Sequence, residues 1–81
     1  MKLPRDISGA DLVRALGRVG YRMTRQSGSH ARLTIDTPSQ HHVTVPLHDS
    51  LKLGTLSGVI SDVAAHLKKS KEELILQLFD S

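Results

Sequence analysis

The sequence predicts an α+β domain in two layers, with the order α-β-β-β-α and a short C-terminal helix. Two observations predict it. Apolar residues recur at helical spacing near both ends of the chain, whereas the middle alternates polar and apolar residues in short runs joined by short turns. Short connections favour antiparallel strands, and helices must bury the apolar face of the sheet. We therefore expect a three-stranded antiparallel sheet with helices on one face. At 81 residues the chain is interpreted as a single domain, 1–81.

The first helix is expected at about residues 8–19, after a short lead-in from Lys2 to Asp6. Ser8 is a typical N-cap residue, and Asp11 follows three positions later in a capping-box pattern. Gly20 is well placed to end the helix. The apolar stripe of this helix consists of Leu12, Val13, Leu16 and Val19.

Three strands are expected at residues 21–26, 30–36 and 41–45, separated by turns at 27–29 and 37–40. Their alternation indicates one buried face and one wet face. The buried face is expected to carry Tyr21, Met23, Ala31, Leu33, Ile35, Val43 and Val45. The wet face is expected to carry only polar and non-acidic side chains, namely Arg22, Thr24, His30, Arg32, Thr34, His42 and Thr44.

A loop from Leu47 to Gly54 then leads to a second helix, for which Thr55 is the expected cap. Its apolar stripe consists of Leu56, Val59, Ile60, Val63 and Leu67. Ser70 and Glu73 form a second capping-box pattern, which opens the short last helix. That helix buries Leu74, Ile75, Leu78 and Phe79.

Composition excludes several function classes. The chain has no cysteine, so it forms no disulfide, thiolate nucleophile or cysteine zinc site. Its only aromatic residues are Tyr21 and Phe79, which argues against a platform for stacking nucleic-acid bases. The net charge of +3 fits an anionic partner. Because no signal peptide and no run of about 20 apolar residues is present, we expect a cytoplasmic protein without membrane contact.

The stretch Gln26–Arg32 holds the candidate functional site. His30 follows a Ser-Gly-Ser turn and has Arg25 and Arg32 close by in the sequence. Histidine exchanges a proton near neutral pH and suits acid–base chemistry, and the arginines would attract a phosphate. Ser29 is expected to hydrogen-bond the turn. On these residues alone, a surface histidine without a chemical role is the more common case.

Three segments of the chain resemble the HicA (YcfA-like) family of bacterial toxins. They are Leu3–Gly9 (LPRDISG), Arg25–His30 (RQSGSH) and Val43–His48 (VTVPLH), and the resemblance continues through Leu51, Leu53 and Gly54-Thr55-Leu56. It covers about residues 2–79. The family implies a fold like the double-stranded RNA-binding domain and the activity of an mRNA interferase, a small endoribonuclease that cleaves messenger RNA. It also implies that His30 is the catalytic histidine and that a HicB antitoxin is the partner.

Under this resemblance His30 is the general base that takes the proton of the RNA 2′-hydroxyl. No metal and no small-molecule cofactor is expected, and the general acid is left open between His42, His48 and water. The residues expected to bind RNA or support the reaction are Arg25, Gly28, Ser29, Arg32, His48 and Lys52. Two other functions fit the same residues: a non-catalytic RNA-binding module and a protein-interaction domain.

Overall fold

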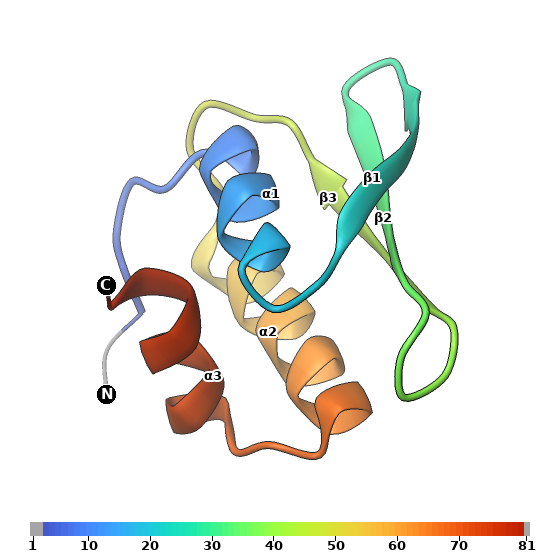
Figure 1. Ribbon diagram of the computed structural model, residues 1–81. Coiled ribbons are helices and arrows are strands. Elements are labelled where there is room, and N and C mark those ends of the chain that lie inside the picture. Colours follow the sequence, from blue (N-terminus) through green and yellow to red (C-terminus); the bar gives the residue numbers. More distant parts are fainter. Residues whose placement is uncertain (1–2, 81) are drawn as a thin grey trace.

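The structure is a computed structural model that describes residues 3–80, and it confirms the predicted α+β class (Figure 1). The strands form one antiparallel sheet in the order β1-β2-β3. The elements are α1 (Gly9–Gly17), β1 (Arg22–Ser27), β2 (His30–Ile35), β3 (His41–Pro46), α2 (Leu53–Leu67) and α3 (Lys71–Phe79). Lys2 of the lead-in, and Met1 and Ser81 of the predicted domain, lie outside the described residues.

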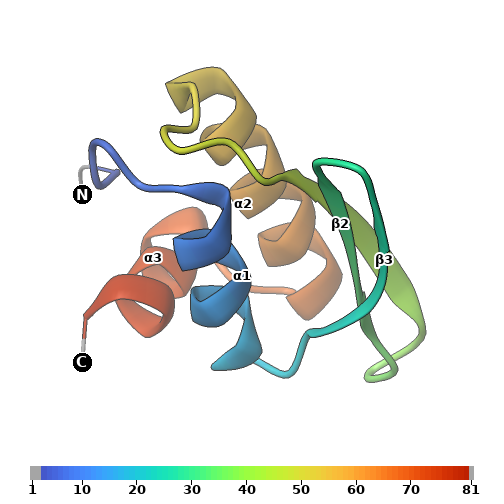
Figure 2. The same ribbon diagram turned by 90° about the horizontal axis from the view of Figure 1, so that it is seen from above.

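All three helices lie on one side of the sheet, so the other face stays open (Figure 2). α1 and α2 pack against the strands, and α3 packs behind them against α1 and α2. The core fills the space between these elements, and its largest fully buried side chains are Leu12, Leu16, Leu33, Leu56, Ile60, Leu74, Leu78, Val45 and Val63. No helix in the described part of the chain is long and apolar enough to cross a membrane.

The N-terminal cap of α1 is the predicted capping box. The Asp11 amide donates to the Ser8 hydroxyl oxygen at 3.0 Å, and the Ser8 amide donates to the Asp11 carboxylate at 3.2 Å. α1 ends at Gly17, and the chain then turns through Gly20, whose φ of 111° lies in the left-handed region that favours glycine. At α3 only half of the predicted box is present, because the Glu73 amide donates to the Ser70 hydroxyl oxygen without a reciprocal bond.

The predicted Thr55 cap of α2 is wrong. α2 begins at Leu53 with Lys52 as its N-cap, and no side chain caps it, so Thr55 lies inside the first turn. The cause is a long-range contact: the Leu51 amide donates to the Ile7 carbonyl at 2.8 Å and fixes the chain just before the helix. The helix therefore begins at Leu53, two residues after this contact.

The loop from β3 to α2 is fastened to the start of α1. The Gly9 amide donates to the His48 carbonyl at 2.9 Å. A Cβ atom on Gly9 would lie 2.7 Å from the Leu47 Cα, which shows how closely the two backbones approach. This contact sets the course of the segment that follows β3.

The predicted alternation of the first strand fails at Thr24. Met23 pairs with Leu33 and Arg25 pairs with Arg32, so Thr24 is an extra residue in a β-bulge. After the bulge, each side chain of β1 lies on the side of the sheet opposite to the one that strict alternation predicts. Met23, expected in the core, is 44% exposed; β1 is an edge strand of the sheet, and none of its residues is buried.

Candidate functional site

His30 is the first residue of β2 and lies beside the β1–β2 turn. It pairs with Ser27 of β1 and with Pro46 of β3. The turn depends on Gly28, whose φ is 57°. The His30 side chain is exposed and makes no hydrogen bond to any described residue, so its imidazole is open to a ligand.

Ser29 fastens this turn to β3 through its main chain. Its carbonyl oxygen accepts a hydrogen bond of 2.6 Å from the Leu47 amide. Among residues 3–80 its hydroxyl has no hydrogen-bond partner, so the expected contribution of the side chain to the turn is not present. The main-chain bond places the residues after Pro46 next to His30.

The open face of the sheet is organised in three rows of side chains across the strands. From the turn outward, the rows are Ser27, His30 and Pro46; Arg25, Arg32 and Thr44; and Arg22, Thr34 and His42. Neighbouring rows lie about 6.6 Å apart, since residues two positions apart along a strand share a face. None of the strand residues is acidic. We call this surface the outer face.

The row farthest from His30 is held by internal contacts. The Thr34 hydroxyl lies 2.8 Å from the Thr24 hydroxyl and 2.8 Å from His42 Nδ1, and this polar ladder explains why Thr34, predicted to be wet, is only 2% exposed. Arg22 Nη1 lies 2.9 Å from Asp36 Oδ2, so its charge is balanced. A hydrogen bond from Gln40, followed by the hydrogen bond and the positive charge of Arg22, holds the pKa of Asp36 below its usual value of 3.8.

The two candidate general acids differ in position. His42 is level with Thr34, four residues along β2 from His30, which places it about 13 Å away along the sheet. His48 follows Leu47, whose amide is bonded to the Ser29 carbonyl, so it lies at the same end of the sheet as His30. Both side chains are exposed. The geometry therefore favours His48 over His42.

Lys52 is not brought beside His30. It is the N-cap of α2, and the start of that helix lies well apart from the β1–β2 turn in both views (Figures 1 and 2). The predicted supporting residues thus divide into two groups. Arg25, Gly28, Ser29, Arg32 and His48 gather around the β1–β2 hairpin and the end of β3, whereas Lys52 lies elsewhere.

A second group of polar side chains lies on the helix side of the sheet, and sequence reasoning missed it. His41 Nδ1 lies 2.8 Å from the Tyr21 hydroxyl, and His41 Nε2 lies 3.2 Å from Asp62 Oδ1. The His41 ring also stacks on that of His66, with 4.4 Å between ring centres. Burial, with a smaller contribution from the charge of Asp62, raises the pKa of Tyr21 to about 12. Because both nitrogens of His41 are engaged, this group ties β3 to α2. Within residues 3–80, no three His, Asp or Glu side chains are arranged to hold a metal ion.

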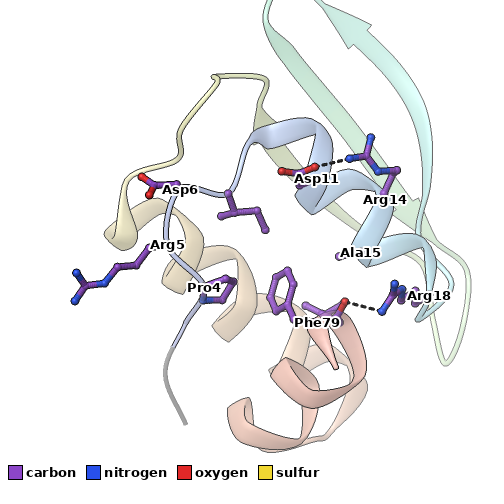
Figure 3. A pocket seen from close by; sticks show the side chains of 10 residues that line it. Pro4, Arg5, Asp6, Asp11, Arg14, Ala15, Arg18 and Phe79 are labelled. Atoms are coloured by element: carbon purple, nitrogen blue, oxygen red, sulfur yellow. Dashed lines mark hydrogen bonds and ion pairs between the residues drawn. The ribbon is translucent and has the colours of Figure 1, made fainter. Parts of the chain in front are cut away.

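A pocket of about 670 Å³ lies between the lead-in, α1 and α3, on the helix side of the molecule (Figure 3). Its arginines are engaged in part: Arg14 pairs with Asp11, and Arg18 Nη1 donates to the Leu78 carbonyl at 3.2 Å. Pro4 and Phe79 contribute apolar surface. The pocket contains no histidine, and none of the site residues predicted from the sequence lines it.

Comparison with known families gives a match of residues 9–69 to the family described as the HicA toxin of bacterial toxin-antitoxin systems. The matched residues run from α1 through all three strands to the end of α2 and include His30. The lead-in motif and α3 lie outside the match. Comparison with curated proteins and with solved structures gives no significant match.

Proposed function

The chain belongs to the HicA toxin family of bacterial toxin-antitoxin systems, and on that premise we propose that it is a metal-independent endoribonuclease that cleaves messenger RNA. One observation carries the proposal. His30 presents an exposed imidazole, free of hydrogen bonds to the described residues, at the end of a sheet face whose strands bear arginines and no acidic side chain. Such a face attracts a phosphodiester and leaves the imidazole available to it.

The reaction needs only groups that RNA and this chain supply. Neutral His30 takes the proton of a 2′-hydroxyl while that oxygen forms a bond to the adjacent phosphorus. The bond between phosphorus and the 5′-oxygen of the next nucleotide breaks. The departing oxygen takes a proton from a general acid, for which we propose the imidazolium of His48. The products are a 2′,3′-cyclic phosphate and a 5′-hydroxyl.

The backbone contacts around His30 and His48 support their roles as general base and general acid. The bond between Ser29 and Leu47 joins the end of β3 to the turn, and the bond from Gly9 holds the carbonyl of His48. The two imidazoles therefore extend from backbone that is fixed on both sides. Positioning of this kind is what allows two groups to act on one phosphate.

The partner we propose is a HicB-like antitoxin, since toxins of this family act in toxin-antitoxin pairs. Contact of the antitoxin with the outer face would keep RNA from His30. A non-catalytic RNA-binding module would use the same face. The two functions differ in whether the bound RNA is cut.

The test is cleavage of a mixed-sequence RNA in excess EDTA by wild type, His30→Ala and His42→Ala. His42 is the matched control, because it lies on the same face but about 13 Å from His30. We expect wild type and His42→Ala to cut, and His30→Ala to be slower by about 10²- to 10⁴-fold. The products should carry 5′-hydroxyl ends, and the matching DNA should stay intact.

Cleavage by a folded His30→Ala variant would refute the role of His30. Loss of wild-type cleavage in EDTA, with recovery on adding a divalent cation, would refute the metal-independent mechanism. RNA binding without cleavage by any of the proteins would favour the binding module. Circular dichroism establishes that each variant is folded.

A further inference from the structure

The bulge at Thr24 brings two arginines face to face on the outer face. Arg25 pairs with Arg32 across β1 and β2, and residues that are directly opposed in a sheet project from the same side. Without the extra residue, Arg25 would point toward the helices. One inserted residue therefore decides that both guanidinium groups lie on the same side as His30.

The charges of this arginine pair are not balanced within the protein. Neither guanidinium makes an ion pair or a hydrogen bond with a residue in the range 3–80, and both side chains are exposed. Arg22, on the same strand and face, pairs with Asp36 at 2.9 Å. Like charges placed directly opposite one another destabilise a sheet, and here no carboxylate of the described chain relieves the repulsion. An external anion bound beside the two guanidinium groups would relieve this repulsion.

The position of the pair indicates which anion. Its row lies directly beside the row of His30, about 6.6 Å along the sheet. This spacing is comparable to that of neighbouring phosphates along a nucleic-acid strand. Guanidinium groups bind phosphate oxygens through two parallel hydrogen bonds, which suits them to a phosphodiester.

Resting on the proposed function, we infer that Arg25 and Arg32 together bind the RNA phosphate next to the one that is cut. The RNA strand then runs along the outer face from His30 toward the Thr34 row. In this arrangement the arginines hold substrate and transition state equally, so they contribute to binding and not to the chemical step. The requirement is for a backbone phosphate, not for a particular base.

The first test measures binding alone. The protein carries His30→Ala to prevent cleavage, and its affinity for a fluorescent single-stranded RNA is measured at several salt concentrations. Each phosphate contact with single-stranded nucleic acid contributes about −0.7 to the slope of log K against log salt. Because the two guanidinium groups share one phosphate, we expect the double variant Arg25→Gln/Arg32→Gln to make the slope less negative by about 0.7, and each single variant to make it less negative by part of this amount. Arg22→Gln is the matched control and should leave it unchanged, since Asp36 already neutralises Arg22.

Two outcomes would overturn the inference. Equal changes in all three variants would mean diffuse attraction by net charge. No change in either the Arg25 or the Arg32 variant would mean that the pair does not contact RNA, and binding of an acidic protein segment would then be the alternative use of the pair. Because the background variant does not depend on cleavage, these results stand even if the proposed reaction is wrong.

The second test separates binding from chemistry in the protein with His30 intact. We expect Arg25→Gln and Arg32→Gln to raise KM and to leave kcat close to that of wild type. A fall in kcat with unchanged KM would place the guanidinium groups on the scissile phosphate and overturn the assignment. Melting temperatures of the variants should not fall, because each substitution removes a repulsion.

Discussion

Replacement of Gly9 by alanine tests how closely the first helix must approach the segment that carries the site. A Cβ atom on Gly9 would lie 2.7 Å from the Leu47 Cα and 2.9 Å from the Pro46 carbonyl carbon, and closer still to the Pro46 carbonyl oxygen. All three are backbone atoms, so no side chain can rotate away. Either α1 or the segment after β3 must move.

The expected loss can be worked out from three contributions. Overpacking of this kind destabilises by about 1–3 kcal/mol. Displacement also weakens the hydrogen bond from the Gly9 amide to the His48 carbonyl, which is worth about 1 kcal/mol. The better helix propensity of alanine returns less than about 1 kcal/mol. The last two contributions nearly cancel, so we expect the free energy of unfolding to fall by about 1–3 kcal/mol, which lowers the melting temperature of a domain this size by roughly 4–24 °C.

Thermal and urea denaturation of wild type, Gly9→Ala and Gly58→Ala make the comparison. Gly58 lies within α2, and a Cβ atom there would meet nothing within 4 Å. Its replacement should therefore stabilise the protein by about 0.5–1 kcal/mol. If Gly9→Ala melts at or above the temperature of wild type, the close approach of α1 to the β3–α2 loop is wrong, and with it the account of how His48 is positioned.

Two further predictions concern pH. Tyr21 is the only tyrosine, so the ultraviolet absorbance of the phenolate reports on this residue alone. Because its pKa is raised to about 12 in the folded protein, its contribution to stability should be complete below pH 10 and should decline as pH rises toward 12. A titration midpoint near 10 would contradict its burial. The Ser8 amide and hydroxyl lower the pKa of Asp11 from 3.8, so the stability that this cap contributes should be present above pH 3.8 and decline as pH falls below it. The gap in melting temperature between wild type and Asp11→Asn should accordingly close in acid, and a gap that persists would contradict the cap.

The elements predicted from the sequence are those that depend on neighbouring residues. The spacing of Leu12 and Leu16, and the alternation of Ala31, Leu33 and Ile35, predict buried faces that the structure confirms. Ser8 and Asp11 form the predicted cap because both partners lie within one helical turn. The start of α2 was predicted wrongly because a contact from the lead-in, distant in sequence, determines it.

The site divides in the same way. His30, Gly28 and Ser29 are contiguous, so any fold that keeps the turn keeps them together. The proximity of His48 depends on one main-chain bond between the turn and the segment after β3, and nothing local signals it. The contact between His41 and Asp62 joins residues 21 positions apart. One local signal exists: His41 lies two and four residues before the buried Val43 and Val45, so the alternation of β3 places its side chain on the same face, toward the helices.

The register of β1 explains why the arginine pair was hidden from sequence reasoning. A strand with one buried face is fixed in register by its apolar side chains, but no residue of β1 is buried. Its register is set instead by the short turn and the backbone pairing with β2, together with the bond between the Thr24 and Thr34 hydroxyls at the bulge. Since those hydroxyls lie on the outer face, the same surface that we propose to bind RNA also helps to fix the position of Arg25 opposite Arg32. The hydrophobic pattern of the sequence does not indicate that Arg25 lies opposite Arg32, because neither side chain is buried in the hydrophobic core.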